Sequence, residues 1–169
     1  MSNKIALATE LGQLLKQQQR MLATAESCTG GGVAEAITDI AGSSAWFDCG
    51  FVTYSNDAKM RLLHVPEGTL AAHGAVSDET AAAMCQGAIA NSKASVALST
   101  TGIAGPDGAV PGKPVGTVYF GWAIGDRITT LRMQFAGDRQ AVREQSVVHA
   151  LQGLLLLLKQ PDANQKQVR

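Results

Sequence analysis

The chain has 169 residues, and its hydrophobic fraction of 46% is that of a globular protein with one sizeable core. Its 14 basic and 14 acidic side chains balance, so bulk charge gives no attraction to nucleic acid or to an anionic membrane. The five leucines at 154–158 fall far short of the ~20 apolar residues that span a membrane, so we expect neither nucleic acid nor membrane as a partner.

Helices and strands are predicted to alternate in the first half of the chain. Apolar residues at helical spacing indicate helices, and short runs rich in β-branched and aromatic residues indicate strands. Capping residues and proline mark the helix starts. In chain order the predicted elements are a helix over 5–15, a strand over 21–25, a helix over 33–40, a strand over 49–55, a short helix from Ser55 or Asn56, and another between Pro66 and Gly74.

The second half is predicted to end in a hairpin and a long helix. Residues 101–116 hold five glycines and three prolines, which excludes a helix or an inner strand and predicts a long functional loop. Gly125 and Asp126 are a two-residue hairpin signal. The predicted elements are a helix over 77–91, a strand over 94–100, the loop, strands over 117–124 and 128–135, a helix from Asp138 to about Lys159, and a frayed tail over 161–169.

This order of elements predicts the fold class. Strands that alternate with helices and are followed by a hairpin indicate a three-layer α/β/α domain with a mixed, mostly parallel sheet. We expect residues 1–160 to form this single domain, with the long helix after the hairpin. The leucine run in that helix indicates a buried helix end or a subunit interface, so we also expect a homodimer or a higher homo-oligomer.

The cysteines and histidines indicate a reducing compartment and no metal. Three cysteines with no close pair favour reduced thiols in the cytoplasm over a disulfide framework. The first residues carry no long apolar stretch, so we expect no secretory signal. The histidines stand apart, and neither His-x-x-x-His nor Cys-x-x-Cys occurs, so we expect no metal site and no cofactor.

The most informative segment is Thr24–Gly32, where a predicted strand stops, a serine and a cysteine follow, and three glycines open onto a helix. Glycine lets the backbone approach a ligand closely, and the first turn of a helix has free N–H groups. Ser27 is therefore a candidate nucleophile. The backbone N–H groups around Thr29, Gly30 and Gly31 are the expected oxyanion donors.

The base paired with Ser27 is predicted to be a lysine. Ser27 lies outside any Gly-x-Ser-x-Gly motif, and no histidine lies at a predicted strand end, where it would serve as the base. Lys59 follows the strand over 49–55 within the first turn of a short helix, a position that disfavours the ammonium form. A solvated surface lysine is the alternative. Tyr54 either hydrogen-bonds the serine hydroxyl or its oxyanion, or it is an ordinary cross-strand aromatic residue.

Two neighbours of Ser27 have alternative roles. Cys28, in the same turn, is either a rival nucleophile or a structural thiol that points into the core. Glu26 orients the nucleophile, holds a substrate hydroxyl or caps the glycine turn through its backbone. The sequence alone leaves these alternatives open.

A second glycine-rich segment, Ser99–Gly108, also leaves a predicted strand end. In open α/β sheets ligands bind outside the carboxyl ends of the strands, so the two glycine segments are expected to form one pocket. The second segment would offer the hydroxyl of Thr101 and the backbone at Gly102 and Gly105 to a polar ligand. Arg143, near the start of the last helix, either supplies a fork for phosphate or carboxylate or lies on the helix surface.

At these residues the chain resembles the CinA C-terminal domain family, which includes stand-alone bacterial nicotinamide-nucleotide amidases. The resemblance extends over about residues 5–158, and several long motifs in the right order make it specific. The segments that carry it are Thr24–Gly31, Gly50–Lys59, Thr101–Gly108 and Lys113–Val118, with Gly74–Ser77 between them.

The resemblance implies an amidohydrolase that converts nicotinamide mononucleotide to nicotinic acid mononucleotide and ammonia in pyridine-nucleotide recycling. It implies a small-molecule nucleotide as substrate and a metal-free serine–lysine mechanism. By motif, the serine nucleophile falls on Ser27, the lysine base on Lys59 and the assisting tyrosine on Tyr54. The threonine and arginine near the substrate fall on Thr101 and Arg143.

Two alternatives to this function are considered. A non-catalytic nucleotide-binding or regulatory module would use the same glycine loops only to hold a phosphate, and it would release no ammonia. A thiol hydrolase would use Cys28 as its nucleophile, and alkylation of that thiol would inactivate it.

Overall fold

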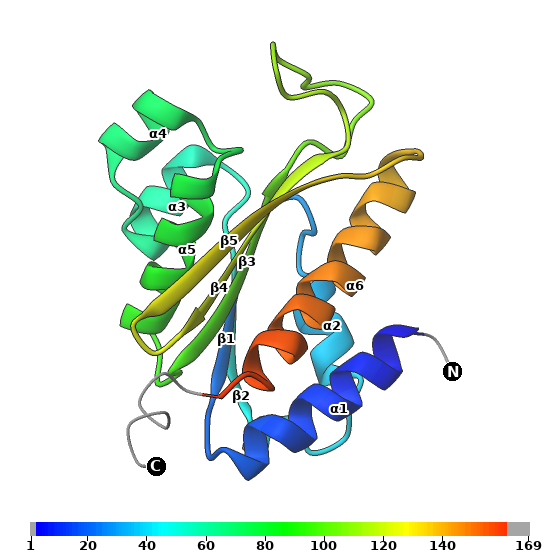
Figure 1. Ribbon diagram of the computed structural model, residues 1–169. Coiled ribbons are helices and arrows are strands. Elements are labelled where there is room, and N and C mark those ends of the chain that lie inside the picture. The colour runs from blue at the N-terminus through cyan, green and yellow to red at the C-terminus, as the bar shows by residue number, and fades with distance from the viewer. Residues whose placement is uncertain (1–2, 162–169) are drawn as a thin grey trace.

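A five-stranded sheet lies at the centre of the protein, whose computed structural model describes residues 3–161 (Figure 1). In chain order the strands are β1 (Leu22–Glu26), β2 (Phe47–Val52), β3 (Val96–Gly102), β4 (Thr117–Ile124) and β5 (Arg127–Gln134). Their order across the sheet is β2-β1-β3-β4-β5. β1 pairs in parallel with β2 and β3, whereas β4 pairs antiparallel with β3 and β5. Of these five strands, β4 therefore runs against the other four, which confirms the predicted mixed, mostly parallel sheet.

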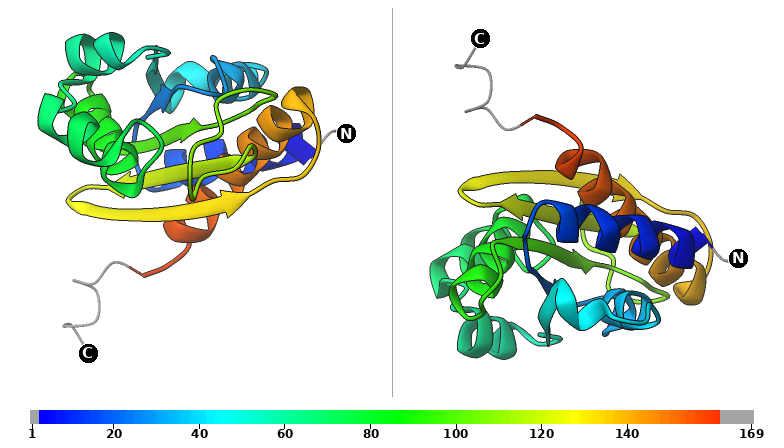
Figure 2. Two further views of the ribbon diagram at one scale, coloured as in Figure 1. Left: turned by 90° about the horizontal axis from the view of Figure 1, so that it is seen from above. Right: turned by 90° about the horizontal axis from the view of Figure 1, so that it is seen from below.

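Helices cover both faces of the sheet, so the predicted three-layer arrangement is confirmed. They are α1 (Asn3–Gln17), α2 (Gly32–Thr38), α3 (Asn56–Leu63), α4 (Glu67–His73), α5 (Asp78–Ala90) and α6 (Arg139–Leu158), with a short 3-10 turn at Ser43–Ala45. Figures 1 and 2 show α1, α2 and α6 on one face and α3, α4 and α5 on the other. The two helix layers enclose separate cores.

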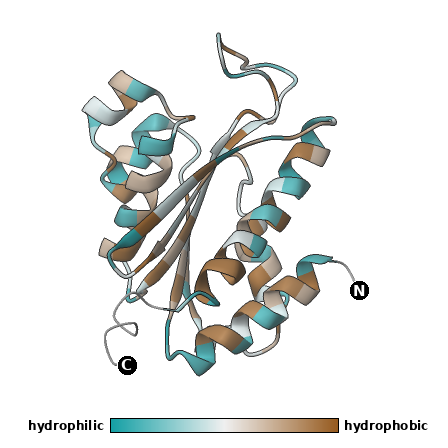
Figure 3. Cartoon of the chain, in the orientation of Figure 1, coloured by the Kyte–Doolittle hydropathy of each residue, from teal (hydrophilic) through white to brown (hydrophobic). Residues whose placement is uncertain are grey.

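The core beneath α6 contains the large side chains. Phe120 and Trp122 of β4 stack with ring centroids 5.7 Å apart, and the Trp122 indole donates a hydrogen bond of 2.9 Å to the Ala150 carbonyl oxygen in α6. Gly153 leaves the space that the Trp122 ring occupies, because a Cβ there would overlap the indole. The last turns of α6 are correspondingly hydrophobic (Figure 3). These contacts fix α6 against the sheet and thereby set where its first turn lies.

The core beneath α5 is built from small residues. Ala23 and Ala25 of β1 and Ala97 of β3 face this helix. A Cβ at Gly121 would lie only 2.7 Å from the Ala81 carbonyl oxygen, so the backbone of α5 approaches β4 closely. This close packing brings the segment that precedes α5 to the carboxyl ends of β1 and β3 (Figure 2).

Several strand boundaries differ from the sequence prediction, and those of β2 and β3 differ most. The strand predicted over 49–55 ends at Val52, because the Ser55 side chain accepts a hydrogen bond from the Ala58 N–H and caps α3 instead. The strand predicted over 94–100 continues to Gly102, because residues 101–102 pair with β4. The helix starts at Ser55, Ser77 and Asp138 and the hairpin turn agree with the prediction.

The leucine run of α6 mostly serves the core of its own chain. Leu154, Leu155 and Leu158 are buried, and Leu157 packs against them, whereas Leu156 is 60% exposed. The expected homo-oligomer stays a prediction. Within residues 3–161, no helix combines the length and the apolar character that a membrane crossing requires. The predicted frayed tail lies, from residue 162 onward, outside the described residues.

Candidate active site

Ser27 lies in a tight turn between β1 and α2. Its backbone N–H donates to the Thr100 carbonyl oxygen at 2.9 Å, and its own carbonyl oxygen accepts from the Gly30 N–H at 3.0 Å. Gly30 and Gly31 have φ angles of 58° and 102°, which L-residues with a Cβ rarely adopt, so the sharp entry into α2 requires glycine here. The Ser27 side chain is only 8% exposed and lines a cavity. The predicted strand–turn–helix setting of Ser27 is therefore present.

Lys59 reaches Ser27 from the neighbouring strand–helix connection. It lies in the first turns of α3 and is 1% exposed. Its Nζ donates to the Ser27 Oγ at 3.0 Å and to the Thr53 carbonyl oxygen at 2.8 Å. The alternative interpretation of Lys59 as a solvated surface lysine is wrong. Because β1 and β2 are parallel neighbours, the turns that follow them meet at one edge of the sheet.

The surroundings of the Lys59 amine favour its neutral form. Its described partners are a hydroxyl and a carbonyl, and no carboxylate lies within ion-pair distance among residues 3–161. Burial lowers the pKa of Lys59 from 10.5 to about 8, because the charged form loses its hydration. At neutral pH about one molecule in ten then carries the neutral amine, which can accept the Ser27 proton.

Glu26 caps the turn and helix that follow it. It is fully buried, and its Oε1 accepts from the Thr29 hydroxyl at 2.6 Å and from the Val33 N–H at 2.8 Å. Its Oε2 accepts from the Ala34 N–H at 3.1 Å. The Thr29 hydroxyl also lies 2.8 Å from the Thr100 hydroxyl. The contacts therefore support a capping role for Glu26. The residue caps through its side-chain carboxylate and not, as the sequence analysis considered, through its backbone.

Replacing Glu26 with glutamine should lower the free energy of unfolding by about 2–3 kcal/mol. A carboxylate accepts at both oxygens, whereas an amide must turn its NH₂ group toward one of the donors and leave that donor unpaired. Urea denaturation would measure the loss. The control is Glu35→Gln on the exposed side of α2, for which we expect a change below about 0.5 kcal/mol. Equal effects of the two substitutions would contradict the capping role.

The turn offers unpaired backbone donors beside Ser27. Gly30 is not one of them, because its N–H is engaged with the Ser27 carbonyl oxygen. The N–H groups of Thr29 and Gly31 have no acceptor in the part of the chain that the structure describes, and the Cys28 N–H interacts only with the thiol of its own residue. The sequence prediction named Thr29 and Gly31 but overlooked Cys28, whose N–H directly follows the nucleophile.

Ser27 and Lys59 open into a cavity of about 240 Å³ formed by several segments. Gly102, at the end of β3, permits close packing of the second glycine segment, because a Cβ there would lie 2.8 Å from the Thr117 carbonyl oxygen. Thr101 lines the cavity, but its hydroxyl donates to the Ala75 carbonyl oxygen at 2.7 Å. The other lining residues are Cys28, Tyr54, Asn56, Ala75, Val76, Gly102–Gly105, Asp107, Gly108 and Arg139.

Tyr54 and Arg139 form one side of this cavity. The Tyr54 side chain is 62% exposed, and its hydroxyl accepts from the Arg139 Nη2 at 2.8 Å, with no hydrogen bond to Ser27. The Arg139 Nη1 donates to the Gly105 carbonyl oxygen at 2.9 Å. The sequence analysis missed Arg139. The sequence did contain a signal for it, because Arg139 directly follows the Asp138 cap and so lies in the first turn of α6.

Arg143 does not line the cavity that contains Ser27. It contacts the turn from the other side, where its Nε lies 3.1 Å from the Cys28 carbonyl oxygen and its Nη2 lies 3.3 Å from the Thr29 carbonyl oxygen. There it lines a separate polar cavity of about 290 Å³ with Lys4 and Glu35. The expected substrate fork at Arg143 is therefore unsupported by the geometry, because α6 turns this side chain toward the back of the loop.

The Cys28 thiol is a poor nucleophile in this setting. Its side chain is buried in the core beneath α6, and burial raises the pKa of the thiol to about 12. It is then protonated at neutral pH, whereas thiol hydrolases attack with the thiolate. All three cysteines of the chain are free. Within residues 3–161, no three His, Cys, Asp or Glu side chains gather where they could hold a metal ion.

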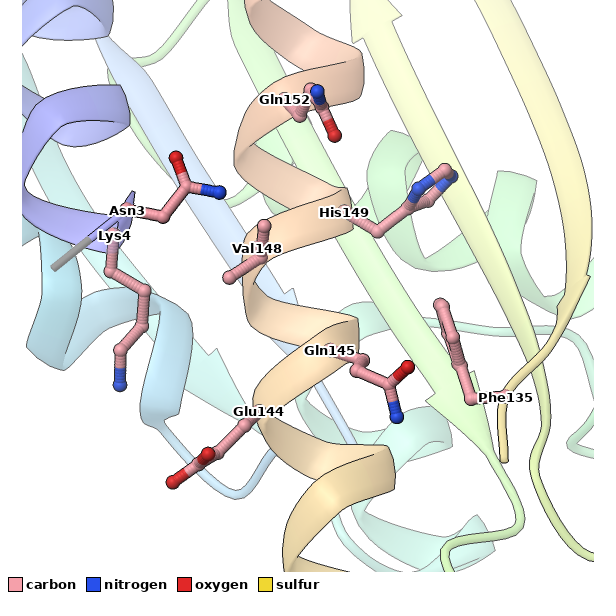
Figure 4. A pocket seen from close by; sticks show the side chains of 8 residues that line it. All are labelled: Asn3, Lys4, Phe135, Glu144, Gln145, Val148, His149 and Gln152. Carbon is pink, nitrogen blue, oxygen red and sulfur yellow. The ribbon is translucent and has the colours of Figure 1, made fainter. Parts of the chain in front are cut away.

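A larger cavity, of about 420 Å³, lies between the start of α1, α6 and the end of β5 (Figure 4). Its lining includes Phe135, Val148 and His149, and burial lowers the pKa of His149. None of the predicted site residues lines it, and it lacks a serine, threonine or cysteine. Size alone does not make it an active site, and it lacks the paired hydroxyl and amine of Ser27 and Lys59 that line the smaller cavity.

Comparisons with known proteins show the family of the chain. The family model of the CinA C-terminal domain matches residues 4–158. The chain is 56% identical over 151 residues to the nicotinamide-nucleotide amidohydrolase PncC of Pseudomonas putida, covering 89% of this chain and 94% of that protein. It is 54% identical over 155 residues to the protein of the same name from Escherichia coli K12, covering 90% and 93%. A crystal structure of competence damage-inducible protein A from Klebsiella pneumoniae superposes with a TM-score of 0.92 and 39% identity, covering 95% and 100%.

Proposed function

Because the chain belongs to the CinA C-terminal domain family, we propose that it hydrolyses the carboxamide of nicotinamide mononucleotide to nicotinic acid mononucleotide and ammonia. The observation that carries this proposal is the contact of 3.0 Å between the Lys59 Nζ and the Ser27 Oγ at a cavity. A buried amine of lowered pKa beside a serine hydroxyl is one arrangement that can activate serine for amide hydrolysis without a histidine. Relatives more than half identical carry this activity in their names.

The first half of the reaction forms an acyl-enzyme. Neutral Lys59 takes the Ser27 proton while the Oγ attacks the carboxamide carbon, which gives a tetrahedral oxyanion. The N–H groups of Cys28 and Thr29 stabilise this oxyanion. The C–N bond then breaks, and nitrogen keeps the electron pair of that bond and takes the proton back from Lys59. Ammonia leaves, and an ester of Ser27 with the nucleotide acid remains.

The second half returns the enzyme to its starting state. Lys59 takes a proton from a water molecule, whose oxygen attacks the ester carbon. The bond between that carbon and the Ser27 Oγ breaks, and the Oγ recovers a proton from Lys59. Nicotinic acid mononucleotide leaves as its carboxylate and releases one proton to solvent. Lys59 carries the protons that pass to and from Ser27, ammonia and water, so both half-reactions need only serine, lysine and water.

Arg139 is the group best placed to hold the substrate phosphate. Its guanidinium lies at the cavity between the Gly105 carbonyl oxygen and the Tyr54 hydroxyl, which hold its plane in place. A planar guanidinium binds phosphate through paired hydrogen bonds. Arg139 thus takes the role that the sequence analysis gave to Arg143, and Tyr54 positions it. We place the reaction in the cytoplasm, where free thiols such as the three of this chain persist.

The rate at low substrate concentration should rise about tenfold per pH unit below pH 8 and level off above it. Burial lowers the pKa of Lys59 to about 8, and only the deprotonated amine can take the Ser27 proton, so the rate follows the neutral fraction upward with pH. Initial rates of ammonia release between pH 6 and 9.5 would give this profile. A rate that is flat or that falls with rising pH across this range would contradict the role of Lys59 as base.

The direct test is ammonia release from nicotinamide mononucleotide by the purified protein, with nicotinamide and nicotinamide riboside as comparison substrates. We expect turnover of the mononucleotide, and weaker turnover of the two compounds that lack the phosphate for Arg139. Binding of the mononucleotide without ammonia release would instead identify a non-catalytic nucleotide-binding module. That outcome would overturn the proposed function.

A further inference from the structure

Arg143 contacts the nucleophile turn in an unusual way. Its guanidinium donates to two successive carbonyl oxygens, those of Cys28 and Thr29, and within the described residues it has no carboxylate partner. A Cβ at Gly30 would lie 3.2 Å from the Arg143 Nη2, so the absence of a side chain there lets the guanidinium lie close against the turn. The partly buried guanidinium is thus held against the nucleophile turn by carbonyl oxygens.

The contact fixes the orientation of one peptide group. The only cis peptide bond among residues 3–161 is Gly105–Pro106, so the peptide between Cys28 and Thr29 is trans. In a planar trans peptide the carbonyl oxygen and the N–H point in opposite directions. Arg143 holds the Cys28 carbonyl oxygen toward the cavity behind the turn, which Thr29 also lines, and the Thr29 N–H is therefore directed away from Arg143.

We propose that Arg143 is a positioning residue that aims and polarises the Thr29 N–H as an oxyanion donor for the reaction at Ser27. Hydrogen bonding to the Cys28 carbonyl oxygen draws electron density from the peptide and strengthens its N–H as a donor. Donors that are fixed before the reaction stabilise the charge that develops in the transition state. This inference deepens the proposed function and rests on its serine chemistry.

The two arginines of α6 then have separable roles. Arg139 faces the substrate cavity, and Arg143, one helical turn later, faces the back of the nucleophile turn. Loss of a substrate contact raises KM, whereas loss of a contact that forms only in the transition state lowers kcat. The split between the two parameters therefore distinguishes positioning by Arg143 from a direct contact with the substrate.

The experiment compares ammonia release by the wild type, Arg143→Gln, Arg143→Lys and Arg139→Gln. For Arg143→Gln we expect kcat to fall about 10- to 100-fold with KM within about twofold, and for Arg143→Lys a smaller fall. For Arg139→Gln we expect mainly a higher KM. The control is Gln145→Ala on the same helix, which removes side-chain hydrogen bonds to the carbonyl oxygens of Ala136, before α6, and Ala141, within α6, and should change neither parameter.

Two further measurements respond to the oxyanion site and not to general stability. Millimolar guanidinium should partly restore kcat in Arg143→Ala, in which the space of the side chain is open. Pyridine-3-boronic acid forms a tetrahedral adduct with a serine hydroxyl, and its Kd should rise about tenfold in Arg143→Gln. Both effects are expected with an unchanged pH profile, because Lys59 is intact in these variants.

The outcomes separate this inference from the proposed function. If the wild type turns over the mononucleotide and Arg143→Gln matches Gln145→Ala in kcat and boronate affinity, the positioning role is wrong and the activity stands. A higher KM with unchanged kcat in Arg143→Gln also overturns the role, because Arg143 would then contact the substrate. If the wild type neither releases ammonia nor binds the boronate at Ser27, the proposed function fails and the inference fails with it.

Discussion

Substitution of Ser27 by alanine is expected to lower kcat for ammonia release by about 10⁴-fold or more. The Ser27 Oγ is the only protein atom in the proposed mechanism that bonds to the carboxamide carbon, and it accepts a hydrogen bond of 3.0 Å from the Lys59 Nζ. KM should change little, because the substrate phosphate is held elsewhere. Steady-state kinetics with a continuous ammonia assay would measure both parameters.

Ser43→Ala is a matched control for this substitution. Ser43 is also 8% exposed, and it lies in the 3-10 turn before β2, away from the Ser27 cavity. The two alanine variants should therefore have free energies of unfolding within about 1 kcal/mol of the wild type and differ only in turnover. Cys28→Ala adds the comparison for the thiol alternative, and it should retain activity. If Ser27→Ala kept its activity within tenfold of the wild type, or if Cys28→Ala lost activity instead, the serine mechanism would be wrong.

The pairing of Ser27 with Lys59 could be predicted because each residue has a local signal. A strand followed by a glycine-rich turn marks Ser27, and a strand followed by a helix that Ser55 caps marks Lys59. The carboxyl ends of parallel neighbouring strands lie at the same edge of the sheet. A fold in which β1 and β2 are neighbours therefore places the two side chains near each other. The sequence could not supply the distance of 3.0 Å or the degree of burial, both of which depend on packing.

The choice between the two arginines of α6 could not be made from the sequence. Arg139 and Arg143 are four positions apart and lie on the same side of the helix. The helical periodicity of the sequence therefore cannot tell which of them faces the substrate. The helix rises about 6 Å between them, and this rise separates the substrate cavity from the back of the nucleophile turn. The path of α6 across the sheet decides which residue meets which surface, and that path depends on long-range packing such as Trp122 against Gly153.

Lys59→Met should abolish the activity and stabilise the fold at the same time. Without the base, kcat should fall about 10³-fold or more. The stability effect follows from the pKa of Lys59, which is about 8 in the folded protein against an ordinary value of 10.5. The unfolded chain therefore binds this proton more tightly than the folded one, and at neutral pH the buried ammonium destabilises the fold by about 3 kcal/mol.

The sign of the pH dependence tests this account of Lys59. Wild-type stability should rise as the pH increases from about 8 to 10.5, because the folded protein loses the proton first. Methionine removes the charge but leaves the Thr53 carbonyl oxygen without its donor, so we expect a net gain of about 1–2 kcal/mol at pH 7 that disappears by pH 10.5. Urea denaturation at both pH values would measure it, with the exposed Lys16→Met as a control that changes neither activity nor stability. A Lys59→Met protein that is less stable than the wild type at pH 7 would mean that the amine is held as a structural cation, and a cation has no free electron pair with which to take the Ser27 proton.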